Sequence, residues 1–250
     1  MTGYEQSEGR RLPRGWRHLA TQVVFLLGFY VVYEIARGLA DRDVTTALWN
    51  GLHVIRIEQW SGTLFEPTIQ SFVDSSQILI QATVYTYWLS QFVVVAAALL
   101  WIYFMHHERF AGFRNWLIAA NVIGLVCYVL VPTAPPRMFP AWGFVDTLGR
   151  YSGVNHASGL IVQVANPYAA MPSLHSMDSF IVGCVMVGIC TSLLARVLWM
   201  LWPAWVWFSV IGTGNHYWLD VVAGVAIAVA TRAALSQRDP LRRRRETQAA

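Results

Sequence analysis

Lysine is absent from this chain of 250 residues, so all 18 basic side chains are arginines. Charged residues make up only 13% of the sequence, about half of the ~25% that is usual for a soluble domain. Hydrophobic residues, in contrast, make up 56% of the chain, which also contains 12 tryptophans. This composition argues against one large soluble domain and favours a protein that crosses a membrane several times.

Cysteine is also scarce, and the three that occur lie inside apolar runs without a CxxC spacing: Cys127, Cys184 and Cys190. The sequence therefore indicates neither a zinc ribbon nor a disulfide framework, and we expect these thiols to be inert packing residues. No groove-reading or base-stacking module accompanies the arginines, so we expect no nucleic-acid partner.

Six apolar segments approach the roughly 20 residues that a membrane-crossing helix needs. They lie near Leu19–Ala40, Thr83–Met105, Asn115–Val131, Ser173–Leu194, Val197–Gly212 and Trp218–Leu235. Basic residues precede the first segment, but no small-residue cleavage site follows it, so we expect a retained anchor rather than a signal peptide. The sequence predicts a membrane domain over 19–236 with basic cytoplasmic tails at 1–18 and 237–250.

The arginines predict which side of the membrane each loop faces. If the N-terminus is cytoplasmic, 13 of the 18 arginines fall on the cytoplasmic side. We therefore expect both termini in the cytoplasm. The absence of lysine is consistent with a high-GC genome, so we expect the membrane to be a bacterial plasma membrane. The loops before the fourth segment and between the fifth and sixth then face outward.

The first outer loop, residues 43–70, places Leu48, Leu52 and Ile55 at helical spacing. It is expected to form an amphipathic helix at the outer interface or a soluble loop packed on the bundle. The apolar run 75–105 exceeds one crossing, which indicates a tilted helix or a short dipping segment. The predicted fold is an all-α integral membrane protein, a six-helix transmembrane bundle with an interfacial amphipathic helix.

In "GTGNHYWLDVVAG", His216 and Asp220 are four residues apart and share one helix face. A carboxylate there fixes the imidazole tautomer and leaves the second ring nitrogen free as a base or nucleophile. Gly212 and Gly214 are expected to let the backbone approach a ligand. The alternative is a helix-end pair that only satisfies its own hydrogen bonds.

In "AMPSLHS", Pro172 suits a first helical turn, where Ser173 and free N–H groups form an anion site. His175 would touch the anion, and Asp178 would orient His175 or cap the helix end. Ordinary N-capping is the alternative. In "VPTAPPRMFP", Arg137 matches phosphate oxygens, unless it only ties the loop to lipid headgroups.

Together these motifs resemble those of the type 2 phosphatidic-acid phosphatase superfamily, whose pattern is Lys-x6-Arg-Pro, PSGH and Ser-Arg-x5-His-x3-Asp. Here "PSLH" replaces the second block, and Ser209, His216 and Asp220 match the third. The lysine is missing, and Val210 stands where arginine is expected. Blocks such as "APPR", "PSLHS" and "HYWLDVVAG" resemble the inositolphosphotransferase and inositol phosphorylceramide synthase branch more closely.

The resemblance covers about residues 120–230 and implies a phosphatase or phosphotransferase core at 115–235. It implies that His216 forms a phosphohistidine, that Asp220 holds its ring and that His175 protonates the leaving oxygen. Phosphate-binding residues would be Arg137, Ser173, Leu174 and Asn215. The expected partners are a lipid phosphate substrate, membrane lipids and a polyol acceptor such as inositol. No cofactor or metal is expected.

Three alternatives remain at this stage. The first is a lipid phosphate or pyrophosphate phosphatase, in which water is the acceptor. The second is a metalloenzyme or metal transporter, in which His175, Asp178, His216 and Asp220 are ligands. The third is a non-catalytic lipid-binding membrane protein.

Overall fold

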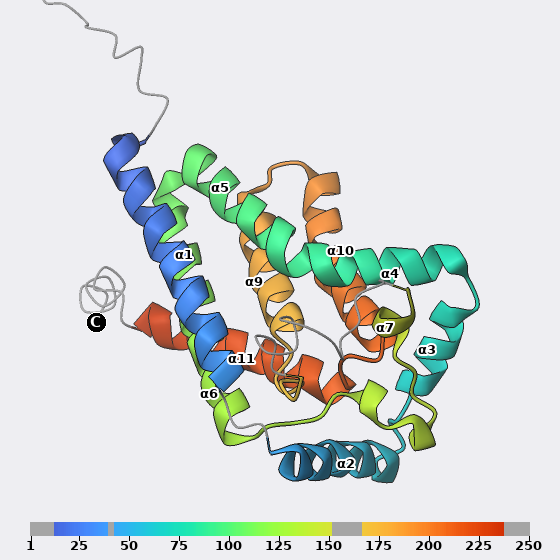
Figure 1. The fold of residues 1–250 in the computed structure, drawn as a ribbon. Helices are drawn as coiled ribbons and strands as arrows, with labels where there is room; N and C mark the ends of the chain where they lie inside the picture. The colour runs from blue at the N-terminus through green and yellow to red at the C-terminus, as the bar shows by residue number, and fades with distance from the viewer. Residues whose placement is uncertain (1–12, 40–42, 152–166, 238–250) are drawn as a thin grey trace, which may run out of the picture.

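The computed structural model describes residues 13–39, 43–151 and 167–237, which form helices joined by loops (Figure 1). Within these ranges β pairing is limited to one isolated parallel bridge between Thr133 and Ala169. The α-helices are α1 (Gly15–Leu39), α2 (Val44–Trp60), α3 (Glu66–Asp74), α4 (Gln77–Leu89), α5 (Val95–Met105), α6 (His107–Leu130), α7 (Thr147–Tyr151), α9 (Leu174–Ile189), α10 (Leu193–Gly212) and α11 (Trp218–Gln237). A π-helix, η1 (Ser90–Val94), joins α4 to α5, and two 3₁₀ turns, η2 (Pro136–Met138) and η3 (Pro140–Trp142), follow α6.

Five helical segments of the described chain are long and apolar enough to cross a membrane. They are Gly15–Gly38, Gln77–Met105, His107–Leu130, Leu193–Gly212 and Trp218–Gln237. The all-helical prediction is confirmed. The count of six spans is not, because α9, which corresponds to the fourth expected segment, has only 16 residues. The chain leaves the helix at Cys190 and starts α10 after the N-cap Ser192, so residues expected in the fourth span belong to the fifth.

The apolar run before residue 105 forms a single helical segment of 29 residues, Gln77–Met105, and no separate short segment precedes it in the membrane-spanning stretch. It is interrupted only by η1, where the backbone takes a wider π turn. Such single π turns inside α-helices often occur at functional sites. The π turn here presents Gln91 to the interior, as described below.

Residues 43–70 form two helices rather than one, and α2 lies across one end of the bundle in Figure 1. The buried face of α2 consists of Ala47, Gly51, Val54, Ile55 and Glu58. The buried face of α2 is therefore shifted by about one residue from the face expected from Leu48, Leu52 and Ile55. Leu48 and Leu52 are only partly buried. Small residues at the contact let α2 approach the bundle.

Helix α9 is the centre of the bundle and contacts α5, α6, α10 and α11. Its side chains Met177, Ile181 and Val182 are fully buried. The indole nitrogen of Trp116 donates a hydrogen bond of 2.8 Å to the carbonyl of Ala228, which joins α6 to α11. Within a membrane, close packing and hydrogen bonds of this kind hold helices together, since lipid tails are as apolar as the side chains.

Candidate active site

The N-terminal ends of α9 and α11 are fixed to each other. The backbone N–H of Ser173 donates to the carbonyl of Asp220 at 3.0 Å. A Cβ on Gly224 would lie 2.4 Å from the Ser173 oxygen, so only glycine permits this approach. This contact brings together the two histidine motifs, which are far apart in the sequence.

The imidazole of His216 is held at one nitrogen by two acceptors. Its Nδ1 lies 2.9 Å from the carbonyl oxygen of Ala170 and 3.3 Å from Oδ2 of Asp220. The same Oδ2 accepts the backbone N–H of Tyr217 at 3.0 Å. Because a carbonyl oxygen can only accept, Nδ1 must carry the proton, and Nε2 keeps its lone pair.

Burial, as the largest effect, lowers the pKa of His216 to about 3. The ring is therefore neutral near pH 7, which suits a nucleophile. The Ala170 carbonyl was not predicted as a site group. A main-chain atom this far away in sequence leaves no pattern from which it could be found.

His175, in the first turn of α9, faces the same space as His216. The centroids of the two rings are 5.8 Å apart, with an angle of 57° between their planes. The other side of His175 stacks on Tyr87 of α4, with a centroid distance of 4.2 Å and an angle of 28°. Tyr87 therefore helps to orient His175, although no motif in the sequence indicates it.

Arg137 is attached to the loop that carries His216. Its backbone N–H donates to the carbonyl of Gly214 at 2.9 Å, and its Nη1 donates to Oδ1 of Asn215 at 2.5 Å. The amide nitrogen of Asn215 in turn donates to Thr213. Among the described residues, no carboxylate pairs with Arg137. The guanidinium thus keeps its charge available beside His216.

A cavity of about 500 Å³ joins these groups. Five of the predicted site residues line it: Arg137, Leu174, His175, Asn215 and His216. Asp220 is fully buried behind His216. Ser173 is also fully buried, and its hydroxyl caps α9 by accepting from the backbone and side chain of Ser176. In this geometry its hydroxyl acts as the N-cap, and the expected contact of Ser173 with phosphate stays a prediction.

The glycines before His216 allow close packing against neighbouring segments, and the expectation that they let the backbone approach a ligand stays a prediction. A Cβ on Gly212 would lie 2.7 Å from Val73 of α3. Gly214 has a φ of 73°, and a Cβ there would lie 2.5 Å from the carbonyl of Val145. The space that these residues leave open is filled by neighbouring segments, so they fix the turn that precedes His216.

Two buried glutamates that the sequence analysis did not select hold the first turn of α11. Oε1 of Glu66 accepts the N–H of Trp218 at 2.9 Å, and Oε1 of Glu58 accepts that of Leu219 at 3.3 Å. Carboxylates at a helix N-terminus satisfy free N–H groups and complement the helix dipole. Burial first, and then the neighbouring Glu66, raises the pKa of Glu58. The sequence does offer one signal, since Glu58 lies on the apolar face of α2.

Asp178 neither orients His175 nor caps the helix end, which corrects both expectations for it. Its two oxygens accept hydrogen bonds from Gln91 at 2.7 Å and Asn121 at 2.8 Å. The metal-site alternative required Asp178 and Asp220 to join the two histidines. In the part of the chain that the structure describes, no group of three or more His, Cys, Asp or Glu side chains could hold a metal ion.

Comparison with known proteins gives two matches. The model of the PAP2 superfamily matches residues 52–234. A phosphoinositol dihydroceramide synthase from Bacteroides thetaiotaomicron is 29% identical over 149 residues, a match that covers 52% of this chain and 47% of the relative. The matched part of the chain thus spans about half the length of that relative. No solved structure matches the chain.

Proposed function

Because this chain belongs to the PAP2 superfamily, we propose that it transfers a phosphoryl group from a membrane lipid through a phosphohistidine at His216. One observation carries the proposal. The two acceptors on Nδ1 of His216 leave the lone pair of Nε2 available in a cavity that also contains His175 and Arg137. Apolar helices of membrane-spanning length support a lipid as the substrate.

In the first step, Nε2 of His216 attacks phosphorus while the bond to the leaving lipid oxygen breaks. Protonated His175 transfers its proton to that oxygen. The ring centroids lie 5.8 Å apart and both rings line the same cavity, so both histidines can contact one phosphoryl group bound there. Arg137 neutralises charge on the phosphoryl oxygens, and the N–H groups at the start of α9 add to this.

In the second step, an acceptor hydroxyl attacks the phosphohistidine, and the neutral His175 removes its proton. The Nε2–phosphorus bond breaks, so both histidines return to their starting states. The name of the Bacteroides relative supports a phosphoinositol group and a hydroxylated acceptor. With water as the acceptor, the same steps describe a lipid phosphatase, which is the second candidate.

A phosphodiester is the donor that best suits this site. The chain has no lysine, and Val210 stands where the superfamily pattern has a second arginine. A terminal phosphate carries about −1.5 to −2 charges at neutral pH, more than the single charge of a diester. With Arg137 as the cation next to His216, we expect phosphatidylinositol to be turned over faster than phosphatidic acid. The opposite preference would refute this part of the proposal.

We further propose that the site faces the extracytoplasmic side and that both chain ends are cytoplasmic. The arginine distribution supports this orientation, although Arg10, Arg11, Arg238 and residues 242–245 lie outside the described residues. The short helix α9 would be the sixth membrane segment, surrounded by the longer spans. In this arrangement α2 lies along the outer interface.

The test is purified protein in liposomes that contain phosphatidylinositol, phosphatidic acid and a dihydroceramide, with inositol and excess chelator. Mass spectrometry follows free phosphate and lipid products together. His216→Ala is the blank, and His53→Ala, which changes an exposed histidine on α2, is the matched control. A new lipid that carries the donor's headgroup phosphate on its own hydroxyl supports the transferase, and release of phosphate or headgroup phosphate without such a lipid supports the phosphatase. Products equal to those of the blank would refute the enzyme proposal and favour a lipid-binding protein.

A further inference from the structure

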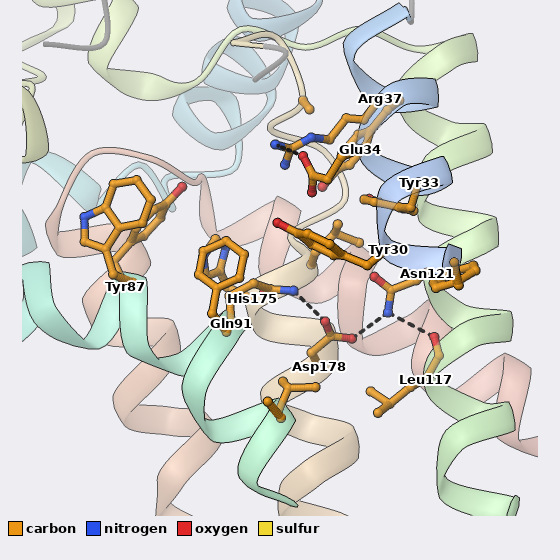
Figure 2. A pocket seen from close by; sticks show the side chains of 18 of the residues that line it. Tyr30, Tyr33, Glu34, Arg37, Tyr87, Gln91, Leu117, Asn121, His175 and Asp178 are labelled. Atoms are coloured by element: carbon orange, nitrogen blue, oxygen red, sulfur yellow. Dashed lines mark hydrogen bonds and ion pairs between the residues drawn. The ribbon is translucent and has the colours of Figure 1, made fainter. Parts of the chain in front are cut away.

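A second group of polar side chains lines the same cavity beside the proposed phosphate site. Asp178 lies one turn beyond His175 on α9, and its carboxylate accepts hydrogen bonds from Gln91 of η1 and Asn121 of α6. Figure 2 shows these bonds, and Glu34 and Arg37 of α1 line the same cavity. Asp178 is only 3% exposed. An ionisable group inside a membrane protein is costly and usually functional.

Several polar atoms in this group are buried without a partner among the described residues. They are the hydroxyl of Tyr33, Nε of Arg37 and Oε1 of Gln91. All three residues line the same cavity as Asp178. A buried donor or acceptor without a partner is unfavourable, so these atoms together suggest a ligand that is absent from the structure.

The unpaired atoms describe the chemistry of that ligand. Tyr33 and Arg37 offer donors, whereas Gln91 and the remaining lone pairs of Asp178 offer acceptors. A hydroxyl group both donates and accepts, and therefore matches this mixture. An anion would be repelled by Asp178 and Glu34. A cation would find the carboxylate of Glu34 already paired with Arg37 at 2.8 Å.

We propose that Tyr33, Gln91 and Asp178 bind the hydroxyl groups of the acceptor, next to the histidines. This inference rests on the proposed phosphoryl transfer. The acceptor is a neutral compound with several hydroxyls, which is either a free polyol or the headgroup of a hydroxylated lipid. Helix α1, which supplies Tyr33, precedes the residues that match the PAP2 superfamily, 52–234. The acceptor site is thus partly built by a helix outside the region shared with the superfamily.

The experiment measures binding of an acceptor to the full chain in detergent, with no phosphoryl donor present. The two probes are myo-inositol and a dihydroceramide, and the same dihydroceramide with methylated hydroxyls is the control ligand. Tyr33→Phe removes only a hydroxyl that has no partner among the described residues, so the melting temperature of this variant should equal or exceed that of the wild type. Asp178→Asn removes the charge at nearly constant shape. Cys184→Ala, at an exposed position on the same helix, is the matched control variant.

We expect one probe to bind the wild type and Cys184→Ala equally. Tyr33→Phe should weaken this binding at least five-fold, and Asp178→Asn at least ten-fold. Loss of inositol binding identifies a free polyol, and loss of dihydroceramide binding identifies a lipid. If neither probe binds the wild type, or if both variants bind as the wild type does, the proposal is wrong. Because binding needs no turnover, this result is independent of the test with His216→Ala.

Discussion

Replacing Asp220 with asparagine tests how the nucleophile is held. Oδ2 of Asp220 accepts both the N–H of Tyr217 and Nδ1–H of His216, whereas its Oδ1 is buried without a partner among the described residues. The Tyr217 N–H therefore selects the orientation in which the asparagine oxygen replaces Oδ2. Both hydrogen bonds survive in Asp220→Asn, and only the charge is lost.

The size of the effect follows from the two distances at Nδ1. The hydrogen bond from Nδ1 to the Ala170 carbonyl, at 2.9 Å, is shorter than the contact with Asp220, at 3.3 Å. This bond is sufficient by itself to keep the proton on Nδ1. Hydrogen bonds to charged groups contribute about 1.5–3 kcal/mol. Losing the charge should therefore lower kcat/KM by about 10- to 100-fold, since each 1.36 kcal/mol corresponds to about tenfold.

The assay is donor turnover in liposomes, together with mass-spectrometric detection of phosphohistidine after rapid quenching. His216→Ala should show neither turnover nor the modified residue, whereas Asp220→Asn should show both at a reduced rate. If Asp220→Asn were as inactive as His216→Ala, the Ala170 carbonyl would not maintain the tautomer, and the reasoning would fail. Asp220→Ala is the comparison in which the bond to Tyr217 is also lost.

Three further predictions concern the surroundings of the site. Burial and Glu66 raise the pKa of Glu58 from its ordinary value of 4.5 to about 9. Between pH 4.5 and pH 9 the folded protein therefore binds one more proton than the unfolded chain, and its stability falls as the pH rises through this range. The melting temperature of Glu58→Gln should therefore drop less between pH 6 and pH 9 than that of the wild type; an equal drop would contradict the raised pKa of Glu58. Gly224→Ala places a Cβ 2.4 Å from the Ser173 carbonyl, and should reduce turnover at least tenfold by separating α9 from α11, whereas Gly112→Ala, where the Cβ meets open space, should have no effect on turnover. Wild-type turnover should persist in excess chelator. If the chelator abolished turnover and a divalent metal restored it, the metalloenzyme alternative would be supported instead.

Much of the site follows from short segments of the sequence. The four-residue spacing of His216 and Asp220 places both on one helical turn, and local geometry is sufficient for that contact. Ser173 as the N-cap of α9 is equally local, because its hydroxyl meets an N–H three residues away. The limits of the spans were less predictable. The break between α9 and α10 lies at Cys190 and Ser192, where the backbone becomes extended, and hydropathy does not detect such a change.

The groups that the sequence analysis missed all act across long sequence separations. Tyr87 stacks on His175, and Glu58 and Glu66 cap a helix that begins more than 150 residues later. Asp178 appeared to belong with His175 because the two are one turn apart. It faces Gln91 and Asn121 instead, since the π turn at η1 and the packing of α6 supply amide donors. No periodic pattern in the sequence indicates any of these contacts.

The sequence by itself determined the helical membrane architecture and the identity of the two histidine motifs, because apolar length, capping residues and one-turn spacings are local properties. The tertiary structure decided which atoms surround those motifs. In the folded protein Nδ1 of His216 contacts the Ala170 carbonyl, Ser173 is fully buried and α1 lines the cavity. Such contacts depend on how helices pack, and packing is settled by the shapes of distant residues together rather than by any one segment.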